Sequence, residues 1–184
     1  MTDNQYEKSE LLNHLSLETE NVQTLKGALD SFFAIEILEG KCGQCSHPRE
    51  RQYFLTQTPQ IAILHLKRFK VDPGRNCYTK IDRNISFGLE LDLEDYYMPD
   101  LENKEDQINL KYELYAMVVH LGRELHSGHY YCFVRTYDNK WHKLNDAEVS
   151  LEEEEEALNQ QCYILFYARK PVDAKPEKEN AQEK

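Results

Sequence analysis

The sequence predicts an α+β domain built mainly on an antiparallel sheet. Segments rich in β-branched and aromatic residues outnumber the segments with helical spacing. Short turn signals, such as Asp72–Gly74 and Tyr137–Asn139, separate neighbouring strand-like segments in the manner of hairpins. The chain has 184 residues, enough for one ordinary domain with a sizeable core.

The two ends of the chain are more polar than its middle and are expected to lie outside the folded domain. We expect residues 1–14 to be a loose leader, residues 15–170 to form the domain, and residues 171–184 to be a disordered polar tail.

One helix is expected early in the domain. Thr24 is a suitable N-cap, and Gly40 is the expected stop. The apolar residues that recur at helical spacing between them are Leu25, Ala28, Leu29, Phe32 and Phe33.

Strands are expected on both sides of an acidic loop over 94–109. Before the loop lie an apolar strand over 61–68 and extended chain over 81–93; after it lies a long strand over 110–121. A polar loop, 122–128, then leads to a hairpin, which is followed by a short acidic helix and a closing strand. The expected strands of that last part are 130–136, 140–144 and 162–167.

The net charge and the cysteine count indicate which classes of partner and which cellular compartment to expect. The net charge of -11 argues against nucleic acid as a partner and favours basic proteins or peptides. Five consecutive acids, Glu152–Glu156, are typical of a solvated helix face. No apolar run approaches the length of a membrane span, and the first ten residues do not form a secretory signal. Five cysteines without a disulfide-framework spacing indicate a reducing compartment, the cytosol or the nucleus.

A histidine and an amide are expected to meet in the last hairpin. If the chain turns about Tyr137, His129 and Asn145 lie roughly opposite each other on neighbouring strands. The amide would fix the imidazole tautomer and leave the other ring nitrogen free to take a proton from a nucleophile. Gly128 would let the chain before the histidine approach a substrate closely.

The sequence around these residues resembles the ubiquitin-specific proteases, which are papain-like cysteine peptidases. The resemblance lies in SGHYYCFVR at 127–135, WHKLNDAEV at 141–149 and CYILFY at 162–167, and blocks at 28–45 and 57–69 resemble the preceding blocks of the family in the same order. It implies the palm and part of the fingers of that catalytic domain, with ubiquitin or a ubiquitinated protein as partner and no required cofactor. It also implies His129 as general base, Asn145 as third member of the triad and Asp146 as a second polar partner.

The sequence lacks the nucleophile motif that the resemblance calls for. That motif is of the type Gly-Asn-Thr-Cys-Tyr, and it does not occur here. Cys132 is expected on the opposite strand face from His129, and Cys162 in the core. Cys77 lies beside a turn without a motif. A separate chain supplying the cysteine-bearing thumb is therefore a possible partner.

Cys42 and Cys45 form a C-x-x-C, half of a zinc site, to which His47 could add a third ligand. Two reduced cysteines without metal are the favoured interpretation. His65 and His120 lie inside expected strands and are expected to be satisfied interior or half-buried residues.

Three functional hypotheses remain open at this point. The first is a deubiquitinase domain that is inactive alone because the cysteine-bearing half is missing. The second is a non-catalytic ubiquitin-binding module, since binding does not need the thiol. The third is a truncated gene product that exposes a normally covered face.

Overall fold

A computed structural model describes residues 7–41, 47–72, 74, 77–99 and 108–172. Its elements, in chain order, are β1 (Leu15–Glu18), α1 (Leu25–Phe32), β2 (Glu36–Lys41), β3 (Pro48–Arg51), β4 (Ile61–Lys67), β5 (Phe69–Asp72), β6 (Cys77–Lys80), β7 (Glu90–Asp92), η1 (Glu94–Tyr96), β8 (Lys111–Leu121), β9 (His129–Arg135), β10 (Trp141–Asn145), β11 (Glu148–Glu152), α2 (Glu154–Leu158) and β12 (Cys162–Arg169).

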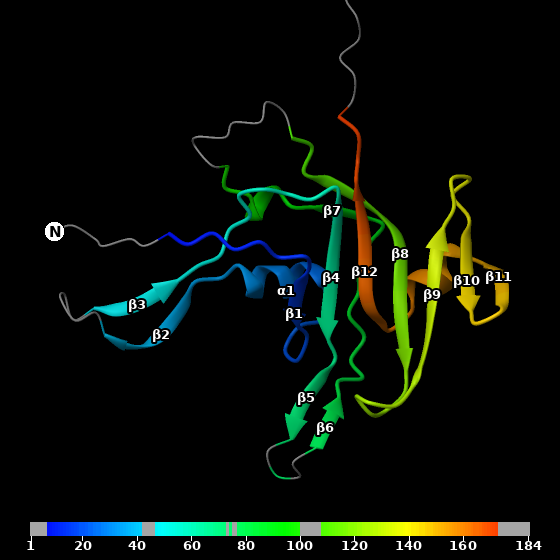
Figure 1. Ribbon diagram of the computed structural model, residues 1–184, viewed down its shortest axis with the longest axis horizontal. Helices are drawn as coiled ribbons and strands as arrows, with labels where there is room; N and C mark the ends of the chain where they lie inside the picture. Colours follow the sequence, from blue (N-terminus) through cyan, green and yellow to red (C-terminus); the bar gives the residue numbers. More distant parts are fainter. Residues whose placement is uncertain (1–6, 42–46, 73, 75–76, 100–107, 173–184) are drawn as a thin grey trace, which may run out of the picture.

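The centre of the fold is an eight-stranded sheet in the order β1-β4-β12-β8-β9-β10-β11, with β7 paired to the start of β8. The β1–β4 pair is parallel, and the other pairs of this sheet are antiparallel. Two separate hairpins, β2–β3 and β5–β6, project from it (Figure 1). The expected α+β fold with a mainly antiparallel sheet is confirmed.

One face of the sheet carries the core. A row of paired residues crosses five strands on this face: Leu64, Leu165, Met117, Phe133 and Lys143. The first four of these side chains are almost completely buried. Leu25, Ala28 and Leu29 of α1 and Ala157 of α2 belong to the same cluster, so both helices cover this face. Neither described helix is long and apolar enough to cross a membrane.

The other face of the sheet is apolar but only half covered. The paired residues that cross it are Ile63, Phe166, Ala116, Val134, His142 and Leu151. The last of these has 62% of its surface exposed, and the others are partly exposed. On β4, β12, β8, β9 and β10, each residue of this row is the sequence neighbour of a residue of the buried row. Side chains alternate between faces along a strand, so the two rows lie on opposite faces of the sheet.

Helix α1 is shorter than the sequence suggested. It starts at the expected N-cap, where the Thr24 side chain accepts a hydrogen bond from the Gly27 amide at 2.9 Å. It ends at Phe32, and Gly40 lies instead inside strand β2 with φ of +85°. The placement of the stop at Gly40 was wrong because residues 36–41 pair with β3.

Strand β11 was not expected. Residues 148–152 pair with β10 along its whole length, so Glu152, placed by the sequence in an acidic helix, ends a strand. Val149 and Leu151 alternate with polar residues there, a period of two that the run of acids obscured. The acidic helix itself is present as α2 over Glu154–Leu158.

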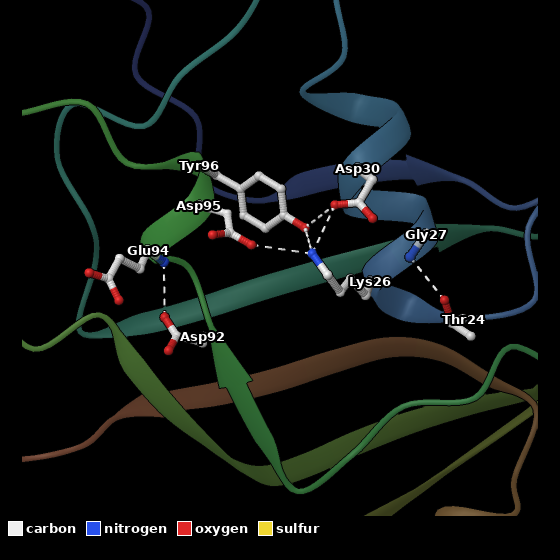
Figure 2. A network of polar contacts seen from close by, with 8 residues as sticks. All are labelled: Thr24, Lys26, Gly27, Asp30, Asp92, Glu94, Asp95 and Tyr96. Carbon is white, nitrogen blue, oxygen red and sulfur yellow. Dashed lines mark hydrogen bonds and ion pairs between the residues drawn. The ribbon is translucent and has the colours of Figure 1, made fainter.

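A polar network fastens α1 to the 3₁₀ turn η1 (Figure 2). Lys26 donates to Asp30 at 3.1 Å and to Asp95 at 3.3 Å, and the Tyr96 hydroxyl donates to Asp30 at 2.7 Å. The Tyr96 hydrogen bond lowers the pKa of the Asp30 carboxyl. Burial, with Asp30 adding to it, raises the pKa of Tyr96 to about 12.

Replacing Tyr96 by phenylalanine should lower the free energy of unfolding at pH 7 by at most about 1 kcal/mol, because water can solvate the largely exposed Asp30. The lowered folded pKa of Asp30 stabilises the protein above the unfolded pKa, and this contribution disappears as pH falls through the folded value. The gap between wild type and Tyr96→Phe in urea titrations should therefore shrink between pH 7 and pH 3. A gap that is constant with pH would contradict this coupling.

Candidate functional site

The hairpin β9–β10 turns as the sequence predicted, at Tyr137–Asn139. The Thr136 amide donates to the Lys140 carbonyl, and the Asn139 amide donates to the Thr136 carbonyl, both at 2.9 Å. Asn139 closes the loop in the left-handed region with φ of +62°. Three-residue hairpin loops commonly end on such a residue, and asparagine tolerates it well.

The register of this hairpin differs slightly from the expectation. Leu144 pairs with Cys132, so the next residue, Asn145, comes opposite Tyr131. His129 and Asn145 are therefore diagonal neighbours, two positions apart, and not directly opposed. Diagonal residues share a face of the sheet, and long side chains can still meet across the ~7–8 Å between them.

The two side chains do meet. His129 Nε2 is hydrogen-bonded to Asn145 Oδ1, and both residues are half-buried. An amide oxygen only accepts, so the proton of this bond belongs to Nε2. The neutral imidazole then has an unprotonated Nδ1, which can take a proton from a nucleophile.

Asp146 occupies the first position of the tight turn between β10 and β11. It is exposed, with φ of +54°, and within the described part of the chain it has no hydrogen bond or ion pair. A left-handed first position fits a two-residue hairpin loop, and aspartate tolerates it. The role of Asp146 as a second polar partner stays a prediction.

Two of the three cysteines within the described ranges, Cys132 and Cys162, lack the placement of a nucleophile for His129. Cys132 pairs with Val118 and alternates with His129 along β9, so the two side chains point to opposite faces. Cys162 is completely buried, and burial raises the pKa of its thiol to about 12. Cys77 is exposed at the start of β6.

The base of the loop before His129 is a close crossing of two chain segments. A Cβ on Gly122 would lie 2.8 Å from Ser127 O and 2.9 Å from Gly128 Cα. A Cβ on Gly128 would overlap His120 Nε2 and lie 2.9 Å from Leu121 O. The expectation that Gly128 makes room for a substrate therefore needs revision, since the space beside it is filled by the His120 ring.

His120 itself is not the satisfied interior histidine that the sequence suggested. It is 3% exposed, and neither ring nitrogen has a hydrogen-bond partner. Burial lowers the pKa of its imidazole, and Lys80 adds to this, while the Ser127 carbonyl opposes it. His65 fits the expectation, because its Nδ1 lies 3.1 Å from Ser16 Oγ.

Metal binding has no support in the part of the chain that the structure covers, where no three His, Cys, Asp or Glu side chains cluster. Cys42 and Cys45 lie outside the described residues, so the half zinc site stays a prediction. His47, the suggested third ligand, is exposed just before β3.

An open pocket of about 370 Å³ lies far from His129. Its lining includes Leu25, Lys26, Phe87, Leu91 and Tyr96, beside the network in Figure 2. β7 pairs with β8 at Glu113, whereas His129 pairs with Leu121, eight residues further along the same strand. At ~3.4 Å per residue, Glu113 and Leu121 are roughly 27 Å apart along β8, so this pocket is not part of the histidine site.

Comparison with known proteins assigns the chain to a family. Residues 6–167 match the family described as ubiquitin carboxyl-terminal hydrolase. The chain belongs to this hydrolase family. Among curated relatives, ubiquitin carboxyl-terminal hydrolases 20 and 23 of Arabidopsis thaliana are 40% and 36% identical to it. These matches cover 89% and 88% of the chain but only 23% and 19% of the relatives.

Solved structures agree with the family assignment. The SAGA Ubp8/Sgf11/Sus1/Sgf73 DUB module bound to ubiquitin aldehyde matches with a TM-score of 0.75 and 32% identity. The match covers 87% of this chain and 36% of the other. The resemblance to ubiquitin-specific proteases is thus confirmed, for a chain that spans about a third of the matched chain in that module.

Proposed function

We propose that this chain is the base-carrying part of a ubiquitin-specific hydrolase domain, in which His129 is the general base and Asn145 orients it. The observation that carries the proposal is the hydrogen bond between His129 Nε2 and Asn145 Oδ1. It leaves Nδ1 as the basic nitrogen, and a Cys-His-Asn arrangement is a known variant of the cysteine-hydrolase triad.

The chemistry follows from this tautomer. Nδ1 takes the proton of a thiol as its sulfur attacks the carbonyl carbon of the terminal glycine of ubiquitin. The imidazolium then gives that proton to the leaving lysine amine as the C–N bond breaks, which leaves a thioester. Water, deprotonated by the same nitrogen, cleaves the thioester and regenerates the thiol. Asn145 keeps the ring in place through each transfer, and the steps require no metal.

The thiol in this proposal comes from sequence outside these 184 residues. Cys132 and Cys162 have the wrong strand face or no access to solvent, and no Gly-Asn-Thr-Cys-Tyr motif is present. The half-exposed apolar row on the second sheet face also favours a domain that is completed by further polypeptide.

Ubiquitin is the proposed partner. The matched Ubp8 module is bound to ubiquitin aldehyde, and this chain shares its fold over 87% of its length. The net charge of -11 suits a basic peptide tail, which the family resemblance implies for the substrate.

A non-catalytic ubiquitin-binding module is the second candidate. One matched SAGA structure contains a Ubp8 chain with a cysteine replaced by alanine, and it is bound to monoubiquitin. Binding in that protein therefore does not need the substituted cysteine. The same would hold here if this chain binds ubiquitin alone.

Reconstitution separates the two candidates. We expect ubiquitin with a C-terminal electrophile to leave this chain unlabelled. Mixing the chain with a family segment that carries the Gly-Asn-Thr-Cys-Tyr motif should produce labelling of that segment's cysteine, detected by mass spectrometry.

Labelling of Cys77, Cys132 or Cys162 in the chain alone would overturn the proposal of an external thiol. Ubiquitin binding by the chain, measured by NMR titration, together with no labelling in the mixture would favour the binding module.

A further inference from the structure

The His120 ring lies directly behind the main chain that leads into His129. His120 is paired with Tyr130 across β8 and β9, and its neighbour Leu121 is paired with His129. Side chains alternate between the faces, so the His120 and His129 rings lie on opposite sides of the sheet. The space that a Cβ of Gly128 would occupy is taken by His120 Nε2.

The His120 ring is held by packing. Its centroid lies 4.6 Å from that of Tyr130, 5.5 Å from that of Phe69 and 6.0 Å from that of Tyr163. It is 3% exposed, and both ring nitrogens lack a hydrogen-bond partner. Its ring is therefore held mainly by its shape, packed among these aromatic rings.

A second contact fixes the other side of the same loop. The Lys80 ammonium donates to His120 O at 2.8 Å and to Gly122 O at 2.9 Å. Lys80 ends the β5–β6 hairpin, which projects from the end of the sheet where β8 turns into β9 (Figure 1). At the base of the 122–128 loop, the Lys80 ammonium thus holds Gly122 by a hydrogen bond, and the His120 ring packs against Gly128.

We propose that His120 is a positioning residue for the general base, because its ring fixes the backbone at Gly128 and so the place from which His129 reaches Asn145. The proposal rests on the proposed role of His129. Without the ring, Gly128 regains the conformational freedom peculiar to glycine. A displacement of about 1 Å at His129 is enough to lose the hydrogen bond to Asn145 and much of the rate.

The test reads the His129 imidazole directly, in the free 184-residue chain. Long-range ¹H–¹⁵N NMR distinguishes Nε2–H from Nδ1–H tautomers. Wild type should show one tautomer for His129, with the proton on Nε2. His120→Ala should show averaging of both tautomers. Gly128→Ala should give the same averaging, because its Cβ would overlap the His120 ring and displace the backbone. With two variants, the test stays valid if one of them fails to fold.

His65→Ala is the matched control. His65 is a half-buried ring in the same aromatic group, 4.8 Å from Tyr163 by centroids, and it is not among the neighbours nearest to a Cβ at Gly128. It should leave the His129 tautomer unchanged. An unchanged tautomer in folded His120→Ala and Gly128→Ala would overturn the positioning role.

The reconstituted hydrolase supplies the kinetic counterpart. His120→Ala should lower kcat about 10- to 100-fold with KM within about twofold, since the substrate surface is intact while the base is misplaced. If the wild-type mixture has no activity, the proposed function fails, but the tautomer measurement still decides the positioning role.

Discussion

Replacing His129 by glutamine should lower kcat of the reconstituted hydrolase about a thousandfold or more, with ubiquitin affinity nearly unchanged. A positioned general base is worth roughly 10²- to 10⁴-fold, and here the same nitrogen must also return its proton to the leaving amine. Glutamine has a similar reach but no basic nitrogen, so it can neither activate the thiol nor protonate the amine. Release of a fluorescent amine from the ubiquitin C-terminus measures the rate.

His126→Gln is the matched control for this prediction. His126 lies three residues before His129, is exposed, and has its ring 6.0 Å from the Tyr78 ring by centroids. It should keep nearly full activity. If His126→Gln and His129→Gln are equally impaired, or if neither is, His129 is not the general base.

Asn145 variants separate orientation from charge. Asn145→Ala removes the acceptor of the His129 Nε2 proton and should cost about 10- to 100-fold in kcat. Asn145→Asp keeps an acceptor oxygen at the same reach and should retain most of the activity. Equal losses in both variants would mean that Asn145 has a role other than holding the ring.

The sequence was sufficient to predict the hairpin that builds this site. Turn residues at 137–139 are a local signal, and Asn139 adopts the left-handed backbone that such a loop requires. The two-residue periodicity then placed His129 and Asn145 on one face. The register was off by two because it depends on how many residues the loop contains, a detail that residue types alone fix poorly.

Contacts between distant segments were beyond the sequence. Nothing local marks His120 as the ring that fills the space at Gly128, because the pairing of β8 with β9 creates that contact. The hydrogen bond from Lys80 to Gly122 likewise joins residues that are 42 positions apart in the sequence. It forms only because the β5–β6 hairpin lies beside the loop. The motif thus located His129 and Asn145, and only the fold revealed which residues support them.

The burial of Arg68 is another feature that no local pattern predicted. The guanidinium is 1% exposed. It donates to Cys162 O at 2.5 Å and to Arg83 O at 2.7 Å, with a longer bond to Ile81 O at 3.4 Å. It thereby links the end of β4 to the start of β12 and to the segment after Lys80, and none of the described carboxylates forms an ion pair with it.

Arg68→Met should therefore lower the free energy of unfolding by about 3 kcal/mol, because one buried and two part-buried carbonyls lose a charged donor. Two effects oppose each other. Burial lowers the pKa of Arg68, so removing this charge relieves a desolvation cost, while the carbonyls lose a cationic donor. We expect the second effect to win, because methionine fills the space but offers no hydrogen bond.

Thermal and urea unfolding of the Arg68 variants decide between these effects. Arg68→Met should unfold roughly 10 °C below wild type, and Arg68→Lys should fall between the two because one ammonium cannot reach all three carbonyls. Arg51→Met is the control: its exposed ion pair with Glu36 should not measurably change the midpoint. A more stable Arg68→Met would show that desolvation dominates, and that the three segments are held together by packing alone.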